Sequence, residues 1–263
     1  MTGKRFFEKG WLRFPHDPVL AEWIACALPA ARAAAVAPEN AKWLRCGGTW
    51  FAGVNALPND ASGAVPGGPA LAGAALDFIH DRLNLPDVAL DRGQVSICYP
   101  GYPNPTPGES KAAFHFRRDR DAAHLDGLLP EGPQRRRYLR ERHGFVLGIS
   151  MVPADAEASP LVVWEGSHRI VRETFMTLFQ GVDPAHWGEI DVTDTYHAAR
   201  RRVFESCARV AVAARPGEAV LVHRLAIHGV APWAETAKAG PDGRMIVYFR
   251  PETGTISDWL FAP

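Results

Sequence analysis

Residues 216–230, PGEAVLVHRLAIHGV, form the stretch on which the fold prediction depends. A Pro-Gly turn at its start launches an apolar, β-like run. After a short break, a second β-like run carries His228, which is followed by glycine. A polar loop at 234–243 then leads to RMIVYFR (244–250), a run of apolar and aromatic residues that begins with Arg244. The stretch therefore predicts three consecutive strands, with a histidine on the second and an arginine at the start of the third.

Other segments after residue 92 have the same character. They are rich in valine, isoleucine and aromatic residues and are bounded by glycine or proline, which is typical of strands. The candidates are QVSICY (94–99), FVLGISMV (145–152), PLVVWEG (160–166), RVAVAA (209–214) and EAVLVHRL (218–225). Between them, 168–180 and 194–207 are predicted as helical insertions.

The N-terminal third has a different composition. Residues 17–37 are rich in alanine and predict one or two helices, interrupted at Pro29. A short strand is expected at 49–55 and a helix at 70–83. There is no internal repeat and no linker. We therefore expect a single domain over residues 1–263, with a helical N-terminal part to about residue 90 and a β-rich core from about 90 to 255.

Composition limits the classes of partner. The chain has 263 residues, of which 47% are hydrophobic, so a packed core is expected. Its formal net charge of zero gives no overall attraction to nucleic acid or to an anionic membrane. The four cysteines are scattered, which favours free thiols in a reducing compartment. No signal-peptide segment is recognised, and no stretch approaches the ~18 apolar residues that span a bilayer. These features predict a cytoplasmic protein.

The stretch DRDAAHLDGLLPEG (119–132) holds a candidate metal site at His124 and Asp126. Side chains two residues apart on a strand point the same way, so His-x-Asp presents two ligands on one face. Two histidines and one carboxylate hold Fe(II) and leave coordination positions open. With 10 His among 263 residues, however, chance alone gives about half a His-x-Asp. The motif gains weight only with a third ligand, and His228 is the preferred one over its rival His223.

The order of these features resembles the phytanoyl-CoA dioxygenase family of Fe(II)- and 2-oxoglutarate-dependent oxygenases. The resemblance covers roughly residues 90–252 and is carried by HLD (124–126), VVWEGSH (162–168), PGEAVLVHRLAIHG (216–229) and RMIVYFRPE (244–252). It implies a double-stranded β-helix, a jelly-roll, cupin-like barrel with flanking helices. It also implies that His124, Asp126 and His228 bind iron and that Arg244 binds the distal carboxylate of 2-oxoglutarate. The implied reaction uses O2 to hydroxylate an unactivated C–H bond, with release of succinate and CO2.

The sequence departs from the family pattern near the cosubstrate. Many members carry Ser or Thr two residues after the distal histidine, where this chain has Val230. Binding of 2-oxoglutarate must then depend on Arg244 or on another hydroxyl, with Tyr248 and Ser96 as candidates. The spacing from His228 to Arg244 is also longer than usual, which makes Arg250 a rival. Six residues apart on one strand, the two arginines share a face, so both can contribute.

The same residues are compatible with other functions. Two His, one Asp and a water also form a catalytic zinc site, so a metallohydrolase on the same barrel is one alternative. A non-catalytic protein that binds a metal or a small molecule is another. A nucleic-acid demethylase fits the R-x5-R spacing but not the neutral charge. The basic runs RRDRD, RRRYLRER and RRR favour a solvated face first and contacts to an anionic small-molecule substrate second.

Overall fold

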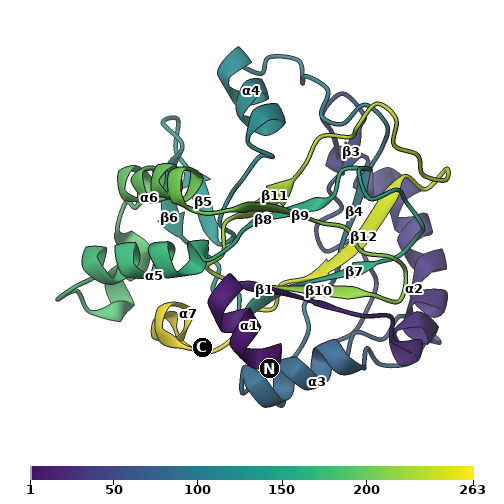
Figure 1. Ribbon diagram of the computed structural model, residues 1–263, viewed down its shortest axis with the longest axis horizontal. Helices are drawn as coiled ribbons and strands as arrows, with labels where there is room; N and C mark the ends of the chain where they lie inside the picture. The colour runs from purple at the N-terminus through teal and green to yellow at the C-terminus, as the bar shows by residue number, and fades with distance from the viewer. Residues whose placement is uncertain (1) are drawn as a thin grey trace.

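The computed structural model describes residues 2–263, and its strands form two facing antiparallel sheets (Figure 1). The larger sheet has seven strands in the order β1-β10-β7-β12-β4-β3-β2, and the smaller has three in the order β11-β8-β9. The strands of the larger sheet are β1 (Trp11–Phe14), β2 (Leu44–Arg45), β3 (Trp50–Phe51), β4 (Gln94–Cys98), β7 (Phe145–Ser150), β10 (Ala219–His223) and β12 (Arg244–Phe249). Those of the smaller sheet are β8 (Leu161–Trp164), β9 (Arg209–Val212) and β11 (His228–Val230). A separate hairpin pairs β5 (Leu128–Glu131) with β6 (Arg136–Leu139).

From β7 onward the chain passes repeatedly between the two sheets. Strands β7, β10 and β12 belong to the larger sheet, while β8, β9 and β11 belong to the smaller one. An isolated bridge between His124 and His228 adds a short antiparallel contact at the β11 edge of the smaller sheet. The two sheets are hydrogen-bonded separately within residues 2–263. The mixed α+β class expected from the sequence, with a large antiparallel sheet, is confirmed.

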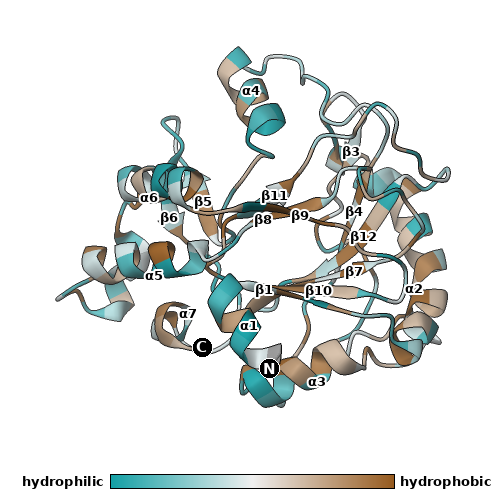
Figure 2. Ribbon diagram, in the orientation of Figure 1, coloured by the Kyte–Doolittle hydropathy of each residue, from teal (hydrophilic) through white to brown (hydrophobic). Residues whose placement is uncertain are grey.

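Successive side chains of β12 point alternately into two different apolar layers. Met245, Val247 and Phe249 pack in the cluster that holds α2 (Pro18–Val36) and α3 (Ala74–Arg82) against the outer face of the larger sheet. Ile246 and Tyr248 point the other way, into a cluster between the two sheets. Figure 2 shows the strands of both sheets largely in brown, while the helices alternate between brown and teal. The site described below therefore lies on the inner face of a sheet whose outer face is covered by helices.

The remaining helices complete the structure. The outer face of the smaller sheet packs with α5 (Ser167–Leu178), α6 (Thr193–Ser206) and α7 (Ile256–Phe261) in one apolar cluster. Helix α4 (Lys111–Asp119) stands apart from both sheets, above β11 in Figure 1. The others are α1 (Thr2–Lys9) and the 3-10 segments η1 (Pro38–Trp43) and η2 (Pro184–Glu189).

The structure corrects several local expectations. Helix α2 continues through Pro29, because its buried side chains, including Trp23 and Ala27, hold it against the sheet despite the lost backbone hydrogen bond. The N-terminal part is not purely helical, since β1, β2 and β3 form both edges of the larger sheet. Helix α4 and the β5-β6 hairpin were not predicted from the sequence.

The expectation that no stretch matches a membrane span was also wrong. Helix α2, Pro18–Val36, is long and apolar enough to cross a membrane by length and composition alone. Core helices of soluble proteins pass the same test. Here Leu20, Trp23, Ile24, Ala27, Ala31 and Ala34 are buried within the chain's largest apolar cluster.

Candidate metal centre

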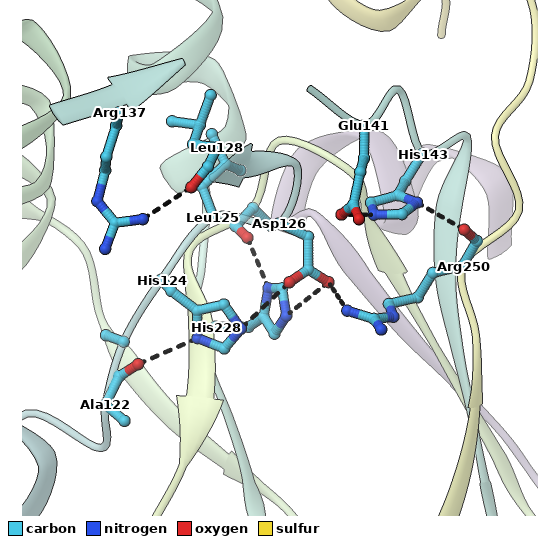
Figure 3. Close-up of polar contacts among 12 residues, drawn as sticks. Ala122, His124, Leu125, Asp126, Leu128, Arg137, Glu141, His143, His228 and Arg250 are labelled. Carbon is cyan, nitrogen blue, oxygen red and sulfur yellow. Dashed lines mark hydrogen bonds and ion pairs between the residues drawn. The ribbon is translucent and has the colours of Figure 1, made fainter. Parts of the chain in front are cut away.

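Three predicted ligands meet between the two sheets (Figure 3). His124 Nε2 lies 3.2 Å from one carboxylate oxygen of Asp126, and His228 Nε2 lies 3.6 Å from the other. One potential ligand atom from each residue lies within 4.8 Å of the other two. Asp126 and His228 are buried, whereas the side chain of His124 is 45% exposed, so the group opens on one side. This is the donor set, with an open side, that non-haem iron sites use.

The backbone brings the two histidines together. His124 N–H donates to His228 O at 2.8 Å, and His228 N–H donates back at 3.1 Å. The close pairing requires glycine at 229, because a Cβ there would lie 2.2 Å from the Asp121 carbonyl oxygen. Gly127 is needed for a similar reason: its φ is +85°, and a Cβ would lie 2.2 Å from the Glu141 carbonyl oxygen. The site is thus encoded by His-Leu-Asp-Gly and His-Gly rather than by the ligands alone.

Both histidines are oriented by the carbonyl two residues before them. His124 Nδ1 lies 3.0 Å from Ala122 O, and His228 Nδ1 lies 3.0 Å from Ala226 O. A carbonyl oxygen only accepts, so each Nδ1 carries a proton and Nε2 is the ring nitrogen available to a metal. The two Nε2 atoms are those that face Asp126. Such hydrogen bonds fix ring orientation in metal sites.

The environment of Asp126 keeps it ionised. Burial by itself would raise its pKa, but the Arg250 guanidinium and the two histidines outweigh burial and hold the pKa well below its usual range. For His228 the directions are opposite. Burial by itself would lower the pKa of this histidine, but the Asp126 carboxylate outweighs burial, so the pKa of His228 is raised. A deprotonated carboxylate beside two imidazoles is what a divalent cation requires.

Arg250 is the cationic partner of this carboxylate. Its Nη1 lies 3.4 Å from Asp126 Oδ2. The arginine is held by its own backbone: its N–H donates to Asp91 Oδ1 at 2.7 Å, and its carbonyl lies 2.5 Å from His143 Nδ1. The other nitrogen of His143 lies 3.0 Å from the Glu141 carboxylate (Figure 3). Arg250 therefore sits among carboxylates and needs no further anion.

A cavity of about 210 Å³ adjoins the metal ligands. The three ligands line it together with the predicted residues Ser96, Tyr248 and Arg250. Val230 and Leu161 lie on the wall formed by the smaller sheet. The rest of the lining comes mainly from the N-terminal segment and β4: Trp43, Arg45, Trp50, Ala52, Val54 and Gln94. The structure thus brings six of the seven predicted site residues to one cavity.

Arg244, the seventh, lies deeper. It pairs with Cys98 on β4, two residues beyond Ser96, and it does not line the cavity. Its guanidinium is buried, and Nη1 has no hydrogen-bond partner among residues 2–263. The Ser159 hydroxyl is also buried without a partner in the same part of the chain. Burial raises the pKa of the Cys98 thiol to about 11, against opposing effects of Arg244 and Ser159, so all three groups are neighbours.

The rival histidine His223 is excluded by position. It lies at the end of β10, where its ring is 5.9 Å from Phe6 and 4.8 Å from His168. Its Nδ1 accepts from Leu225 N at 2.9 Å. None of these neighbours lines the cavity, so the structure selects His228.

Sequence reasoning missed Ser159 and the cavity wall of Trp43, Arg45 and Trp50. Ser159 carries no motif, and only its φ of +51° and its burial single it out. The wall residues lie in a segment whose pairing with β4 was not predicted.

The comparisons with known proteins give structural matches only. No family model matches the chain, and no curated protein matches it. Among solved structures, the non-heme alpha ketoglutarate dependent epimerase SnoN from nogalamycin biosynthesis has a TM-score of 0.48 and 16% identity, over 95% of this chain and 79% of that one. The non-heme monooxygenase ThoJ, as its nickel complex, has a TM-score of 0.45 and 17% identity, over 97% and 80%. EctD from S. alaskensis with 2-oxoglutarate and 5-hydroxyectoine has a TM-score of 0.44 and 14% identity, over 95% of this chain and 75% of that one.

The chain carries a two-histidine, one-aspartate group arranged as a facial metal site.

Proposed function

We propose that this chain is an Fe(II)- and 2-oxoglutarate-dependent dioxygenase that hydroxylates a C–H bond of a small organic molecule. The observation that carries the proposal is the convergence of His124, Asp126 and His228 within 4.8 Å, at the edge of a cavity. Both histidines present Nε2, the carboxylate is ionised, and one side is open. Three protein ligands with open positions suit a metal that must also bind a cosubstrate and O2.

We also propose that the two facing sheets form a double-stranded β-helix barrel. Strands β4, β12, β7 and β10 are consecutive in the larger sheet, and the His124 bridge, β11, β8 and β9 are consecutive on the smaller side. Among these strands the chain crosses between the two sets at every step except from β8 to β9, which is the strand order of a double-stranded β-helix. We take residues 1–263 as one domain, with the barrel core over about 90–255, because N-terminal strands complete both edges of the larger sheet.

The polar atoms around the cavity support a dianionic cosubstrate. Tyr248 Oη, Arg250 Nε, Arg244 Nη1 and Ser159 Oγ are all buried without a hydrogen-bond partner among residues 2–263. Buried polar groups are normally satisfied, and an unpaired buried cation is costly. Three of these residues, Tyr248, Arg244 and Ser159, have donors that a carboxylate would satisfy, while Arg250 already faces Asp126. A hydrolase that holds only zinc and water gives the Arg244 guanidinium no anionic partner.

Arg244 is the better candidate for the distal carboxylate. Arg250 already faces Asp126, with Glu141 and Asp91 also raising its pKa, so its charge is neutralised within the protein. Arg244 is buried and forms no ion pair among the described residues. Ser159 lies beside it and supplies a hydroxyl in place of the one that Val230 lacks. Tyr248 and Ser96 line the cavity beside the metal ligands.

When bound, Fe(II) with 2-oxoglutarate and O2 supplies the oxidising power for hydroxylation, with release of succinate and CO2. The chain's own residues bind and orient. His124, Asp126 and His228 hold the metal, while Arg250 fixes the Asp126 carboxylate. Val146, Leu161 and Val230 give the cavity apolar walls that limit access of water.

We also propose a small-molecule substrate and a cytoplasmic enzyme that acts on neither nucleic acid nor membranes. The formal net charge of zero supports a protein that acts on neither nucleic acid nor membranes, and the four free thiols support a cytoplasmic location.

The test is succinate formation. The purified full chain is incubated in air with 2-oxoglutarate and either Fe(II) or Zn(II), and succinate is measured by NMR. We expect slow succinate release with Fe(II) alone, faster release with a substrate, and none with Zn(II). Hydrolysis of esters or amides by the zinc form without 2-oxoglutarate would favour the metallohydrolase. Absence of both activities, and of any 2-oxoglutarate binding by the metal-loaded chain, would contradict the proposal.

A further inference from the structure

One wall of the cavity is built by a hairpin that extends the larger sheet beyond β4. Arg45 on β2 pairs with Trp50 on β3, and Trp50 pairs in turn with Cys98 on β4. Residues directly opposite one another in adjacent strands send their side chains to the same face. That face is the one on which Ser96, two residues from Cys98, lines the cavity. The hairpin therefore directs Arg45 and Trp50 toward the space next to the metal ligands.

Two indole rings lie on this wall, and that of Trp50 is held by a hydrogen bond. Trp50 Nε1 donates to Ser96 Oγ at 3.1 Å, and its ring meets Tyr102 edge-on at 6.3 Å. The backbone of Trp43 is anchored, since its carbonyl accepts from Ala52 N at 2.9 Å, and its ring lies under the Arg45 guanidinium. Both indoles are half-buried and line the cavity. Large aromatic surfaces in fixed positions suit an apolar ligand, above all a planar one.

The charges in the cavity are unequal. The lining includes two arginines, Arg45 and Arg250, but a single carboxylate, Asp126, and Arg250 pairs with that carboxylate. Arg45 has its guanidinium carbon 5.1 Å from the centre of the Trp43 ring. Its side chain makes no hydrogen bond or ion pair with any residue in 2–263. One cation at the cavity wall is thus left without an anion, beside two indoles.

We propose that the substrate of this site is a small carboxylic acid with a planar apolar body. The carboxylate pairs with Arg45, and the body packs against Trp43 and Trp50. Arginine binds carboxylates through two parallel hydrogen bonds, and stacking on Trp43 orients its planar guanidinium for this. This inference deepens the proposed function, because it rests on the cavity being the active site. Its binding test, however, needs no turnover.

Lys42 provides a matched control. Its ammonium lies 5.5 Å from the same Trp43 ring, but Lys42 does not line the cavity. Arg45→Gln and Lys42→Gln remove the same charge from the same indole at positions three residues apart. Only the first changes the cavity.

The experiment measures binding of matched probes to the nickel-loaded full chain, with 2-oxoglutarate present, by calorimetry. The probes are phenylacetate, 3-phenylpropionate and indole-3-acetate, each beside its neutral amide. We expect at least one acid to bind about ten-fold more tightly than its amide. Arg45→Gln should remove that preference, and Lys42→Gln should keep it. Trp50→Leu should weaken acid and amide alike, because it removes apolar contact without changing charge.

Three results would overturn the inference. The first is equal binding of acids and amides, or no binding of any acid at low millimolar concentration. The second is loss of the preference in Lys42→Gln as well, which would reflect general attraction. The third is weaker 2-oxoglutarate binding in Arg45→Gln with unchanged binding of the acids, which would assign Arg45 to the cosubstrate. Failure of the proposed function is a separate result: the wild-type chain would then bind no 2-oxoglutarate at all.

Discussion

Arg250 Nη1 lies 3.4 Å from Asp126 Oδ2, so the residue that follows β12 holds the carboxylate of the metal centre. The guanidinium does two things at once. It neutralises a buried charge, and it fixes which way the carboxylate faces. The sequence suggested Arg250 as a rival cosubstrate ligand, whereas the structure places it against the ligand set.

Removal of this contact should weaken metal binding. In Arg250→Ala, Asp126 loses its cation and its orientation, and loss of such an outer partner typically costs 10–100-fold in metal affinity. Arg250→Lys keeps the charge and should recover part of the loss. Calorimetric titration with Ni(II) measures both, and Arg142→Gln, which breaks an exposed pair with Glu252, is the control. Unchanged affinity in Arg250→Ala would show that Asp126 needs no support.

The choice between two histidines can be tested directly. His228→Ala removes a ligand, so it should abolish succinate formation and lower metal affinity by at least about 100-fold. His223→Gln changes a buried histidine outside the cavity and should leave metal affinity intact. Circular dichroism confirms that each variant is folded before titration. If His223→Gln loses the metal while folded, the assignment of His228 as the third ligand is wrong.

Gly229→Ala should disturb the site through the backbone. The added Cβ would lie 2.2 Å from the Asp121 carbonyl oxygen, so β11 must move away from the 121–124 segment and carry His228 with it. We expect a loss of about 2 kcal/mol in unfolding free energy and weaker metal binding. Gly240→Ala is the matched control, because nothing lies within 4 Å of a Cβ there. Urea denaturation and metal titration of the two variants are compared. Equal behaviour would mean that the close approach is relaxed in solution.

Ser159→Ala should weaken 2-oxoglutarate binding without changing metal affinity. A hydrogen bond to a charged group is worth about 1.5–3 kcal/mol, which corresponds to a roughly 10–100-fold rise in Kd. Ser150→Ala removes another buried hydroxyl, but that one donates to Ala214 O and should have no effect on the cosubstrate. Titration of 2-oxoglutarate into the nickel-loaded variants decides the matter. A Ser159→Ala protein with wild-type affinity would move the clamp to Tyr248 or Ser96.

Two buried histidines outside the site predict acid sensitivity. Burial lowers the pKa of His168 to about 4, and it lowers the pKa of His223 well below its usual value. Arg172 and Arg169 add to this effect on His168. Both rings stay neutral in the folded state, while the unfolded chain takes up protons below about pH 6.5. Stability should therefore fall as pH drops from about 6.5 to 4, by roughly 3 kcal/mol from His168 alone.

Urea denaturation at several pH values between 7 and 4 measures this loss. His168→Gln keeps a donor for the Phe7 carbonyl but does not titrate, so its stability should depend less steeply on pH. His186→Gln, at an exposed position, should follow the wild-type profile. Parallel profiles for the wild type and His168→Gln would contradict the assignment.

Much of the secondary structure follows from the sequence, because the deciding patterns are local. The predicted runs at 94–99, 145–152 and 244–250 became β4, β7 and β12, within two residues at each end. The long helix was also predicted, although its passage through Pro29 was not. That passage depends on burial of Trp23 and Ala27 against a distant sheet, which no local pattern reports. Likewise, a short strand at 49–55 was predicted and became β3, but its pairing with β4 and with β2 was not.

The candidate site also combines features set by local sequence patterns with features set by distant neighbours. The sequence by itself determined the ligand types and their order, because His-x-Asp, His-Gly and an arginine on a following strand are short-range patterns. Only the tertiary structure separated the two arginines. Arg244 begins β12 and Arg250 directly follows it, yet Arg250 reaches Asp126 while Arg244 remains buried beside Cys98 and Ser159. What distinguishes them is their neighbours on strands far away in the sequence, and a charge takes its role from the groups that surround it in space.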